Sequence, residues 1–357
     1  MLAVWVILHH LTGDRMLLDA WSRTWPEAAR SLLEGGYLAV QTFFILSGFV
    51  LARSYASTTW NRHSLVRFAT ARFARIYPAY LLSLVLISWF ALQFAMRPGR
   101  SAIAKAAVLG DYVFVLQGWK GSLAVGWNTP AWSLSCEFFF YLCFPLLFLW
   151  LRRGGMVRIF GALGISFVVP MLLARAGVPP FWKPIHHLSD FLAGIAAAGL
   201  FNAISRSGMA KRRGAWLYLP ALVIGVAFTA HPQVLNGTPL TLNTVLRPLN
   251  VALLIGLAME GGFVARILSN KTAGYLGQVS YSMYILHIPL LWWYTALTFF
   301  AFGATPPAWT GFVYMALVVA ASIAAFEFVE KPANTWIRDW VAARMQPVRP
   351  SAMRAAA

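Results

Sequence analysis

Three titratable side chains interrupt long apolar segments of this sequence and are its strongest candidates for chemistry. His10 closes the first apolar segment, Glu137 lies inside a later one, and Asp190 opens another. Because a titratable group inside a lipid bilayer is costly, each is a candidate catalytic residue. A histidine that meets a carboxylate in a partly dry site suits general acid–base catalysis, since the carboxylate fixes the imidazole tautomer and supports its charged form. The alternative is that each side chain simply hydrogen-bonds a neighbouring helix.

A further histidine, His287, lies near the middle of the apolar segment 275–301. An unpaired imidazole there would be expensive, so His287 must have a polar partner. The favoured interpretation is a buried structural histidine, and the alternative is a place in the reaction centre or its lining. We also expect His9, Ser47 and Tyr141 to line the cavity that holds the site.

The basic segment 53–77 is the second candidate site. Arg72 and Arg75 are three positions apart, hence on one face if the segment is helical. Guanidinium groups bind phosphates through two parallel hydrogen bonds, so the pair could hold a phosphorylated ligand. The alternative is a positive-inside anchor, and charge alone favours the anchor.

The amino-acid composition indicates a membrane protein. Hydrophobic residues make up 59% of the 357 positions and charged residues 11%, with a mean hydropathy of +0.65. Soluble domains carry about 25% charged residues, so a soluble globule is excluded. The apolar segments approach the roughly 20 residues that span a bilayer, and they lack the alternating pattern of an outer-membrane barrel. We therefore predict an all-α polytopic membrane protein.

The chain divides into one transmembrane domain, residues 1–335, and a cytoplasmic tail, residues 336–357, that is partly disordered. The stretch 97–130 is long for a connection, and its apolar part, Ala106–Leu116, is too short to cross a bilayer, so it is expected at the interface or as a re-entrant segment. Ten spans are predicted, near residues 2–12, 36–53, 77–96, 131–151, 157–174, 188–204, 215–231, 243–259, 275–301 and 309–329.

The distribution of positive charge predicts the orientation. About two thirds of the 29 Lys and Arg residues follow even-numbered spans, which places both termini in the cytoplasm of a multi-pass protein of the cytoplasmic (inner) membrane. Topology and anionic lipid headgroups then explain most of the net charge of +18, and no nucleic-acid partner is implied. In this orientation His10, Glu137 and Asp190 share a similar depth. We expect them to line one extracytoplasmic cavity whose cytoplasmic opening is bordered by Arg72 and Arg75.

The two cysteines and the N-terminal segment predict no disulfide, metal site or cleaved signal peptide. Cys136 and Cys143 lie on one predicted helix, separated by a rise of about 10.5 Å. That distance exceeds the Cα separation of a disulfide, and neither a disulfide framework nor a metal site is predicted. The first apolar segment has no small-residue cleavage site, so it is expected to remain as a helix.

Six motifs resemble, in order, the successive signatures of the membrane O-acyltransferases of acyltransferase family 3. They are Leu2-Ala-Val-Trp-Val-Ile-Leu-His-His-Leu11, Phe43-Phe-Ile-Leu-Ser-Gly-Phe49, Arg72-Phe-Ala-Arg-Ile-Tyr-Pro78, Trp132-Ser-Leu-Ser-Cys-Glu-Phe-Phe-Phe-Tyr141, Ser189-Asp-Phe-Leu-Ala-Gly194 and Ser280-Tyr-Ser-Met-Tyr-Ile-Leu-His287. Six ordered motifs are far more specific than any one of them. A ten-helix core with cytoplasmic termini is also what that family has.

The resemblance implies roles for individual residues. His10 would be the catalytic histidine of the first helix, and Arg72 with Arg75 would be the Arg-x-x-Arg pair associated with the acyl-coenzyme A (acyl-CoA) donor. Acyl-CoA, with acetyl as the default acyl group, would be a cytoplasmic co-substrate rather than a bound cofactor. The acceptor hydroxyl would come from the other side, and His10 would act on it as a general base or relay the acyl group.

Two departures from the family pattern affect these expectations. Family members normally carry an arginine eleven positions before the histidine, and counting back from His10 ends before Met1. A truncated start is therefore expected. Some relatives carry a soluble esterase-like domain, and this chain is expected to be the stand-alone form. The acceptor is then a cell-surface carbohydrate, a lipid-linked oligosaccharide or a small molecule.

A proton-coupled transporter is the alternative function from a different class. Ten helices with intramembrane His, Glu and Asp residues would serve a proton pathway. However, the sequence lacks the paired repeats with matching broken helices that transporters tend to show. The Arg72 pair and the ordered motifs also have no purpose in a transporter, so the sequence favours the enzyme.

Overall fold

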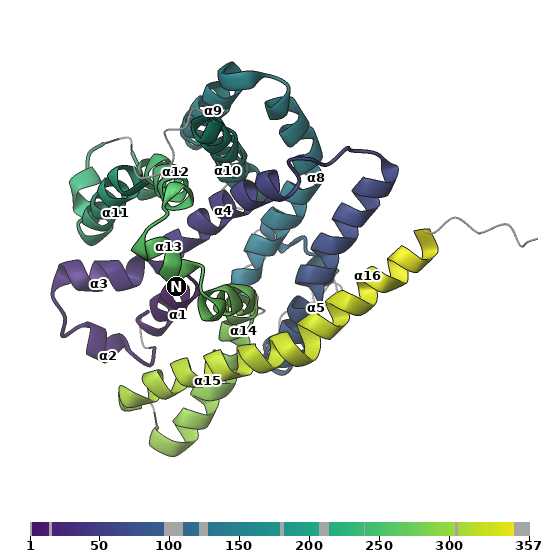
Figure 1. The fold of residues 1–357 in the computed structure, drawn as a ribbon. Helices are drawn as coiled ribbons and strands as arrows, with labels where there is room; N and C mark the ends of the chain where they lie inside the picture. Colours follow the sequence, from purple (N-terminus) through teal and green to yellow (C-terminus); the bar gives the residue numbers. More distant parts are fainter. Residues whose placement is uncertain are drawn as a thin grey trace, which may run out of the picture.

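The computed structural model describes residues 2–13, 16–95, 110–120, 128–178, 182–206, 214–238, 240–303 and 306–345. All regular elements within these residues are helical (Figure 1). The elements are α1 (Leu2–Leu11), α2 (Asp19–Ser22), α3 (Glu27–Glu34), η1 (Gly35–Leu38), α4 (Ala39–Ser54), α5 (Arg62–Ala95), α7 (Gln117–Lys120), η3 (Thr129–Ala131), α8 (Trp132–Arg152), α9 (Gly155–Arg175), α10 (Lys183–Arg206), α11 (Gly214–Ala230), η4 (Pro232–Leu235), α12 (Leu242–Met259), α13 (Phe263–Leu268), α14 (Lys271–Phe302), α15 (Trp309–Ala325), η5 (Phe326–Glu330) and α16 (Lys331–Met345).

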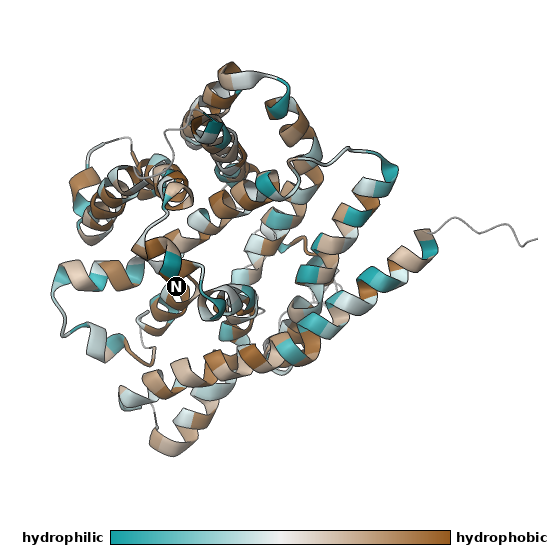
Figure 2. Ribbon diagram, in the orientation of Figure 1, coloured by the Kyte–Doolittle hydropathy of each residue, from teal (hydrophilic) through white to brown (hydrophobic). Residues whose placement is uncertain are grey.

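The helices have the lengths and surfaces of membrane spans. Eight helical stretches within the described residues are long and apolar enough to cross a bilayer, and α1 and α11 are shorter apolar helices. Hydrophobic residues cover the outer as well as the inner sides of the helices (Figure 2). Leu142, Leu146 and Phe300 are each more than 70% exposed. Such faces suit lipid, so the predicted all-α polytopic membrane protein is confirmed, and each of the ten predicted spans coincides with a helix.

Helix α5 begins earlier than the sequence suggested. Asn61 and Ser64 cap its N-terminus reciprocally: the Ser64 N–H donates to Asn61 Oδ1 at 2.9 Å, and the Asn61 N–H donates to Ser64 Oγ at 2.8 Å. The basic segment 53–77 is therefore helical from Arg62 onwards. Arg72 and Arg75 lie within this helix, about one turn apart, and share one of its faces.

Helices α4 and α10 approach each other at two glycines. A Cβ atom on Gly194 of α10 would collide with the carbonyl oxygen of Ile45, and a Cβ on Gly48 of α4 would collide with that of Phe191. Small residues let membrane helices pack with their backbones in contact. The motifs around Ser47 and Asp190, far apart in sequence, are thereby brought face to face.

A π-helical turn, Phe326–Glu330, joins α15 to α16 and turns Glu330 into the protein. Glu330 is 1% exposed, accepts a 2.7 Å hydrogen bond from Ser282 Oγ, and forms an ion pair with Arg75. Short π-helical segments are frequent at functional sites. The helical part of the C-terminal segment reaches Met345, and the tail expected to be disordered lies outside the described residues from 346 onwards.

The stretch that follows α5 packs inside the bundle where it is described. The Tyr80 hydroxyl donates to the Tyr112 carbonyl at 2.5 Å, and Gln117 Nε2 donates to the Ala131 carbonyl at 2.6 Å. Residues 110–120 are thus held between α5 and the start of α8. Residues 106–109 of the expected interfacial or re-entrant segment lie outside the described residues.

We predict that the stability of the protein depends on the close approach of α4 and α10. Gly194→Ala should lower the free energy of unfolding by about 1–3 kcal/mol, because the added methyl group forces two backbones apart. Gly164→Ala is the control, since a Cβ there meets no atom within 4 Å. Thermal unfolding of the detergent-solubilised protein measures both. Equal midpoints for the two variants would contradict this account of the packing.

Candidate active site

His10 of α1 and His287 of α14 form a contact at the centre of the site. His10 Nδ1 lies 2.9 Å from the Val6 carbonyl oxygen and 3.4 Å from His287 Nε2. His287 is fully buried, and its Nδ1 lies 2.6 Å from the Tyr284 carbonyl oxygen. The Tyr314 hydroxyl donates to the carbonyl oxygen of His287. The polar partner that the sequence required for His287 is therefore His10, together with backbone groups.

These contacts select one tautomer for each imidazole. A backbone carbonyl can only accept, so the nitrogen facing it must carry the proton. His287 then has Nδ1–H and an Nε2 lone pair, and His10 has an Nδ1–H shared between Val6 and that lone pair. In the neutral ring, the Nε2 atom of His10 then carries no proton. It is thus the nitrogen available to accept one from a reacting group.

A cavity of about 460 Å³ adjoins His10. Its wall includes His9, as expected, and Gln41. Two further lining residues, Lys183 and His187, were missed by the sequence analysis. The signal that could have identified them is their position just before the predicted span 188–204, close to Asp190. The wall consists of Val6, His9, His10, Tyr37, Val40, Gln41, Thr129, Pro130, Trp132, Lys183, His187, Asn243 and Tyr284.

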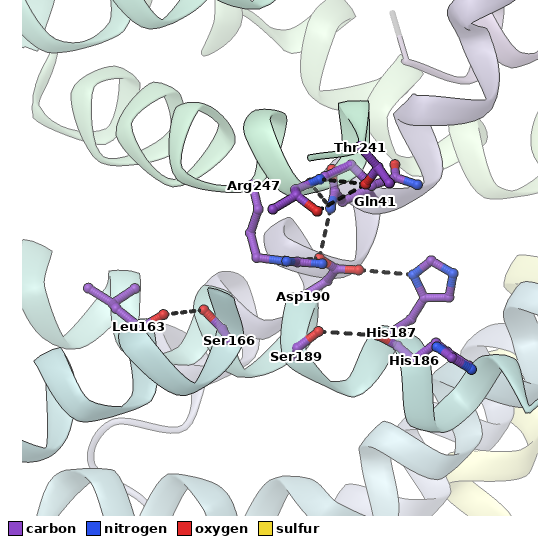
Figure 3. A network of polar contacts seen from close by, with 11 residues as sticks. Gln41, Leu163, Ser166, His186, His187, Ser189, Asp190, Thr241 and Arg247 are labelled. Atoms are coloured by element: carbon purple, nitrogen blue, oxygen red, sulfur yellow. Dashed lines mark hydrogen bonds and ion pairs between the residues drawn. The ribbon is translucent and has the colours of Figure 1, made fainter. Parts of the chain in front are cut away.

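Asp190 does not line this cavity but contacts two residues that do, Gln41 and His187 (Figure 3). It is fully buried, and its Oδ1 accepts hydrogen bonds from Arg247 Nε at 2.6 Å and Gln41 Nε2 at 2.9 Å. Its Oδ2 lies 2.9 Å from His187 Nδ1. The histidine–carboxylate pair that the sequence predicted for His10 therefore occurs at His187.

Glu137 lines a different cavity, of about 260 Å³, together with Arg72 and Arg75. Tyr141 donates a 3.0 Å hydrogen bond to Glu137 Oε2, and Ser47 also lines this cavity. The expectation of one cavity lined by His10, Glu137 and Asp190 thus differs from the structure, because the helices place the three side chains in separate cavities. This second space is here called the arginine cavity.

The two arginines of this cavity have different surroundings. Arg75 pairs with Glu330, and its Nη2 donates to the Gln278 carbonyl at 2.7 Å. Arg72 Nε, in contrast, is buried without a hydrogen-bond partner among the described residues. An unsatisfied buried donor is costly, so Arg72 retains binding capacity that Arg75 has already used.

The His10 cavity and the arginine cavity share two wall residues, Val40 and Tyr284. The Tyr284 hydroxyl donates to the Pro130 carbonyl at 3.1 Å, and the Tyr284 ring centroid lies 6.0 Å from that of His287. Tyr284 therefore stands between a candidate base and a candidate phosphate site. A ligand that bridges the two cavities would pass this side chain.

A comparison with known protein families identifies the family of this chain. The family model described as an acyltransferase domain, that of acyltransferase family 3, matches residues 1–327. The chain belongs to acyltransferase family 3. The matched residues include all six motifs and the residues that line the two cavities.

Relatives of this family 3 chain include enzymes from several bacteria. It is 34% identical over 215 residues to acyltransferase MdmB of Streptomyces mycarofaciens, covering 54% of this chain and 52% of the relative. It is 24% identical over 330 residues to peptidoglycan O-acetyltransferase OatA of Listeria monocytogenes, covering 85% and 52%. The chain spans about half the length of these relatives. No solved structure matches it.

We predict that the buried Asp190–Arg247 pair is indispensable for folding. Asp190→Asn should cost about 3–5 kcal/mol of unfolding free energy, because it leaves the Arg247 charge buried without its partner. Glu34→Gln is the control: it breaks the exposed Arg30–Glu34 pair, whose loss should cost at most about 1 kcal/mol. Thermal unfolding of purified protein tests both, and similar small losses would refute the assignment.

Proposed function

We propose that this chain is a membrane O-acyltransferase that moves an acyl group, with acetyl as the default, from cytoplasmic acyl-CoA to a hydroxyl group. The acceptor is a carbohydrate that is extracytoplasmic or linked to a lipid, and the setting is the cytoplasmic membrane. The observation that carries this proposal is the contact of His10 Nδ1 with the Val6 carbonyl, which leaves Nε2 as the acceptor nitrogen of the neutral ring, in a cavity whose wall adjoins the arginine cavity. Relatives named as acyltransferases support the reaction class.

In the proposed reaction His10 is the general base. Its Nε2 takes the proton of the acceptor hydroxyl while the hydroxyl oxygen attacks the thioester carbonyl carbon. The carbon–sulfur bond breaks, the thiolate of coenzyme A leaves, and the proton on His10 is available to it. The lone pair of His287 Nε2 accepts from His10 Nδ1–H and so stabilises the positive charge that His10 acquires, while Val6 holds the ring in place.

The donor is proposed to place its phosphates near Arg72 and its thioester beside Tyr284. Arg72 has an unused donor atom, whereas Arg75 is held by Glu330, so Arg72 is the main phosphate ligand and Arg75 mainly shapes the site. Glu137 with Tyr141 lies further along the same cavity and is proposed to position the pantetheine arm. Asp190 is proposed to orient His187 beside the acceptor.

His10→Ala should abolish acyl transfer while protein level and membrane insertion remain normal. Loss of a general base typically reduces the rate by about 10² to 10⁴. His9→Ala removes a neighbouring imidazole that lines the same cavity and should cost much less. The measurement is transfer of radiolabelled acetyl from acetyl-CoA to glycan in membranes that contain each variant.

Two outcomes of this comparison would overturn the assignment of the base. Normal transfer in His10→Ala would remove His10 from the chemistry. A severe loss in His187→Ala with near-normal transfer in His10→Ala would instead assign the base to the His187–Asp190 pair.

Arg72→Lys should raise the apparent KM for acetyl-CoA with little effect on kcat. Lysine keeps the positive charge but loses the two-pronged geometry that suits phosphate. Arg67→Lys is the matched control, an exposed arginine of the same helix. The acetyl-CoA dependence of transfer in membranes tests this prediction, and wild-type behaviour of Arg72→Lys would leave Arg72 as a topological anchor.

A further inference from the structure

A third cavity, of about 530 Å³, adjoins the His10 cavity and is here called the basic cavity. The two spaces share Lys183, His187 and Asn243 in their walls. The basic cavity is bounded by the C-terminal end of α9 and the N-terminal parts of α10 and α12, on the side predicted to be extracytoplasmic. A molecule that presents a hydroxyl to His10 could therefore extend into it.

The basic cavity carries an excess of positive charge. Arg175, Lys183 and Arg247 line it, and Asp190 is the sole carboxylate among its lining residues. That carboxylate is already engaged by Arg247 and His187. Two cationic charges are thus left without a counter-charge in the wall, in a protein whose surroundings are largely apolar. Such a concave basic surface attracts anions.

Lys183 stands where the basic cavity meets the His10 cavity. Its ammonium nitrogen lies 4.0 Å from the centroid of the Trp132 ring, which also lines the His10 cavity. The Trp132 ring is in turn 5.3 Å from the His187 ring. The cation–π contact holds the ammonium in place without neutralising it, and no ion pair of Lys183 occurs within the described part of the chain.

Arg247 supplies the second observation. It is 4% exposed, and its Nε is used by Asp190, as Figure 3 shows. Its Nη1 is buried with no hydrogen-bond partner among the described residues. A buried guanidinium donor without an acceptor is costly, whereas an anionic oxygen in the cavity would satisfy it.

We propose that the basic cavity binds an anionic group, a phosphate or a carboxylate, of the acceptor whose hydroxyl His10 activates. This inference rests on the proposed acyl transfer and narrows the acceptor to an acidic carbohydrate or one linked through phosphate. Lys183 and Arg247 contact the anion, and Arg175 adds charge at the mouth. The anion then fixes the orientation in which the acceptor hydroxyl meets His10 Nε2.

The test is a binding measurement on the full chain in lipid nanodiscs without acyl-CoA. Three probes are titrated by calorimetry: methyl glucuronide for a carboxylate, glucose 1-phosphate for a phosphate, and methyl glucoside as the neutral counterpart. At least one anionic probe should bind about tenfold or more tightly than methyl glucoside. The stronger of the two anionic probes identifies the source of the charge.

Variants at both ends of α10 connect this preference to the cavity. Lys183→Gln should weaken anionic binding by about tenfold or more, since hydrogen bonds to charged groups are strong, and should leave methyl glucoside unaffected. Lys183→Arg should largely retain binding. Arg206→Gln removes one charge from the far end of the same helix and should have no effect. Equal binding of neutral and anionic probes, or equal losses in Lys183→Gln and Arg206→Gln, would overturn the proposal.

Acetyl transfer to the same three probes separates this inference from the reaction itself. The anion site and the proposed reaction are both supported if the wild type transfers acetyl preferentially to an anionic probe and Lys183→Gln loses this preference. The loss should come from a higher KM for the anionic probe and not from a lower kcat. Transfer that ignores the charge of the probe refutes the anion site alone. Selective binding without transfer to any acceptor refutes the proposed reaction while supporting the anion site.

Discussion

The site depends on one constraint: an imidazole in an apolar interior must have its N–H group paired. In this protein two backbone carbonyls meet that need, Val6 for His10 and Tyr284 for His287. Both rings are thereby fixed in tautomer and direction, and the Nε2 lone pair of His287 is aimed at His10. In the proposed mechanism, the role of His10 Nε2 as the base follows from the partners of the other three ring nitrogens.

The remaining helices keep this arrangement and its cavities in place. Helices α4, α10 and α12 are tied together by Asp190, which receives hydrogen bonds from Gln41 and Arg247. Gly194 allows the backbones of α4 and α10 to touch. A buried carboxylate that accepts hydrogen bonds from two neighbouring helices restrains how those helices can pack. Near Arg72 and Arg75, the helices are held in place by Glu330, which the π-helical turn directs towards Arg75.

Much of the architecture could be predicted from the sequence, because the apolar segments have bilayer length and the charges fall between them. Candidate residues could also be named: His10 because a titratable group in an apolar segment is costly, and Arg72 because two arginines three positions apart share one face of a helix. The side chains that these residues contact could not be identified from the sequence. His10 and His287 are 277 positions apart, and their contact depends on how α1 packs against α14. Likewise, the pairing of Asp190 with Arg247 depends on the approach of α10 to α12, which periodicity does not encode.

The central claim is that donor and acceptor meet at His10 Nε2, with Tyr284 between the two cavities. The most direct test is a structure of the full chain in nanodiscs with a thioether analogue of acetyl-CoA, which binds but cannot transfer its acyl group. We predict that the diphosphate contacts the guanidinium of Arg72 and that the acyl carbon passes Tyr284 to face His10 Nε2. An analogue bound away from the arginine cavity, or a His10 ring that turns Nδ1 towards the acyl group, would contradict the account.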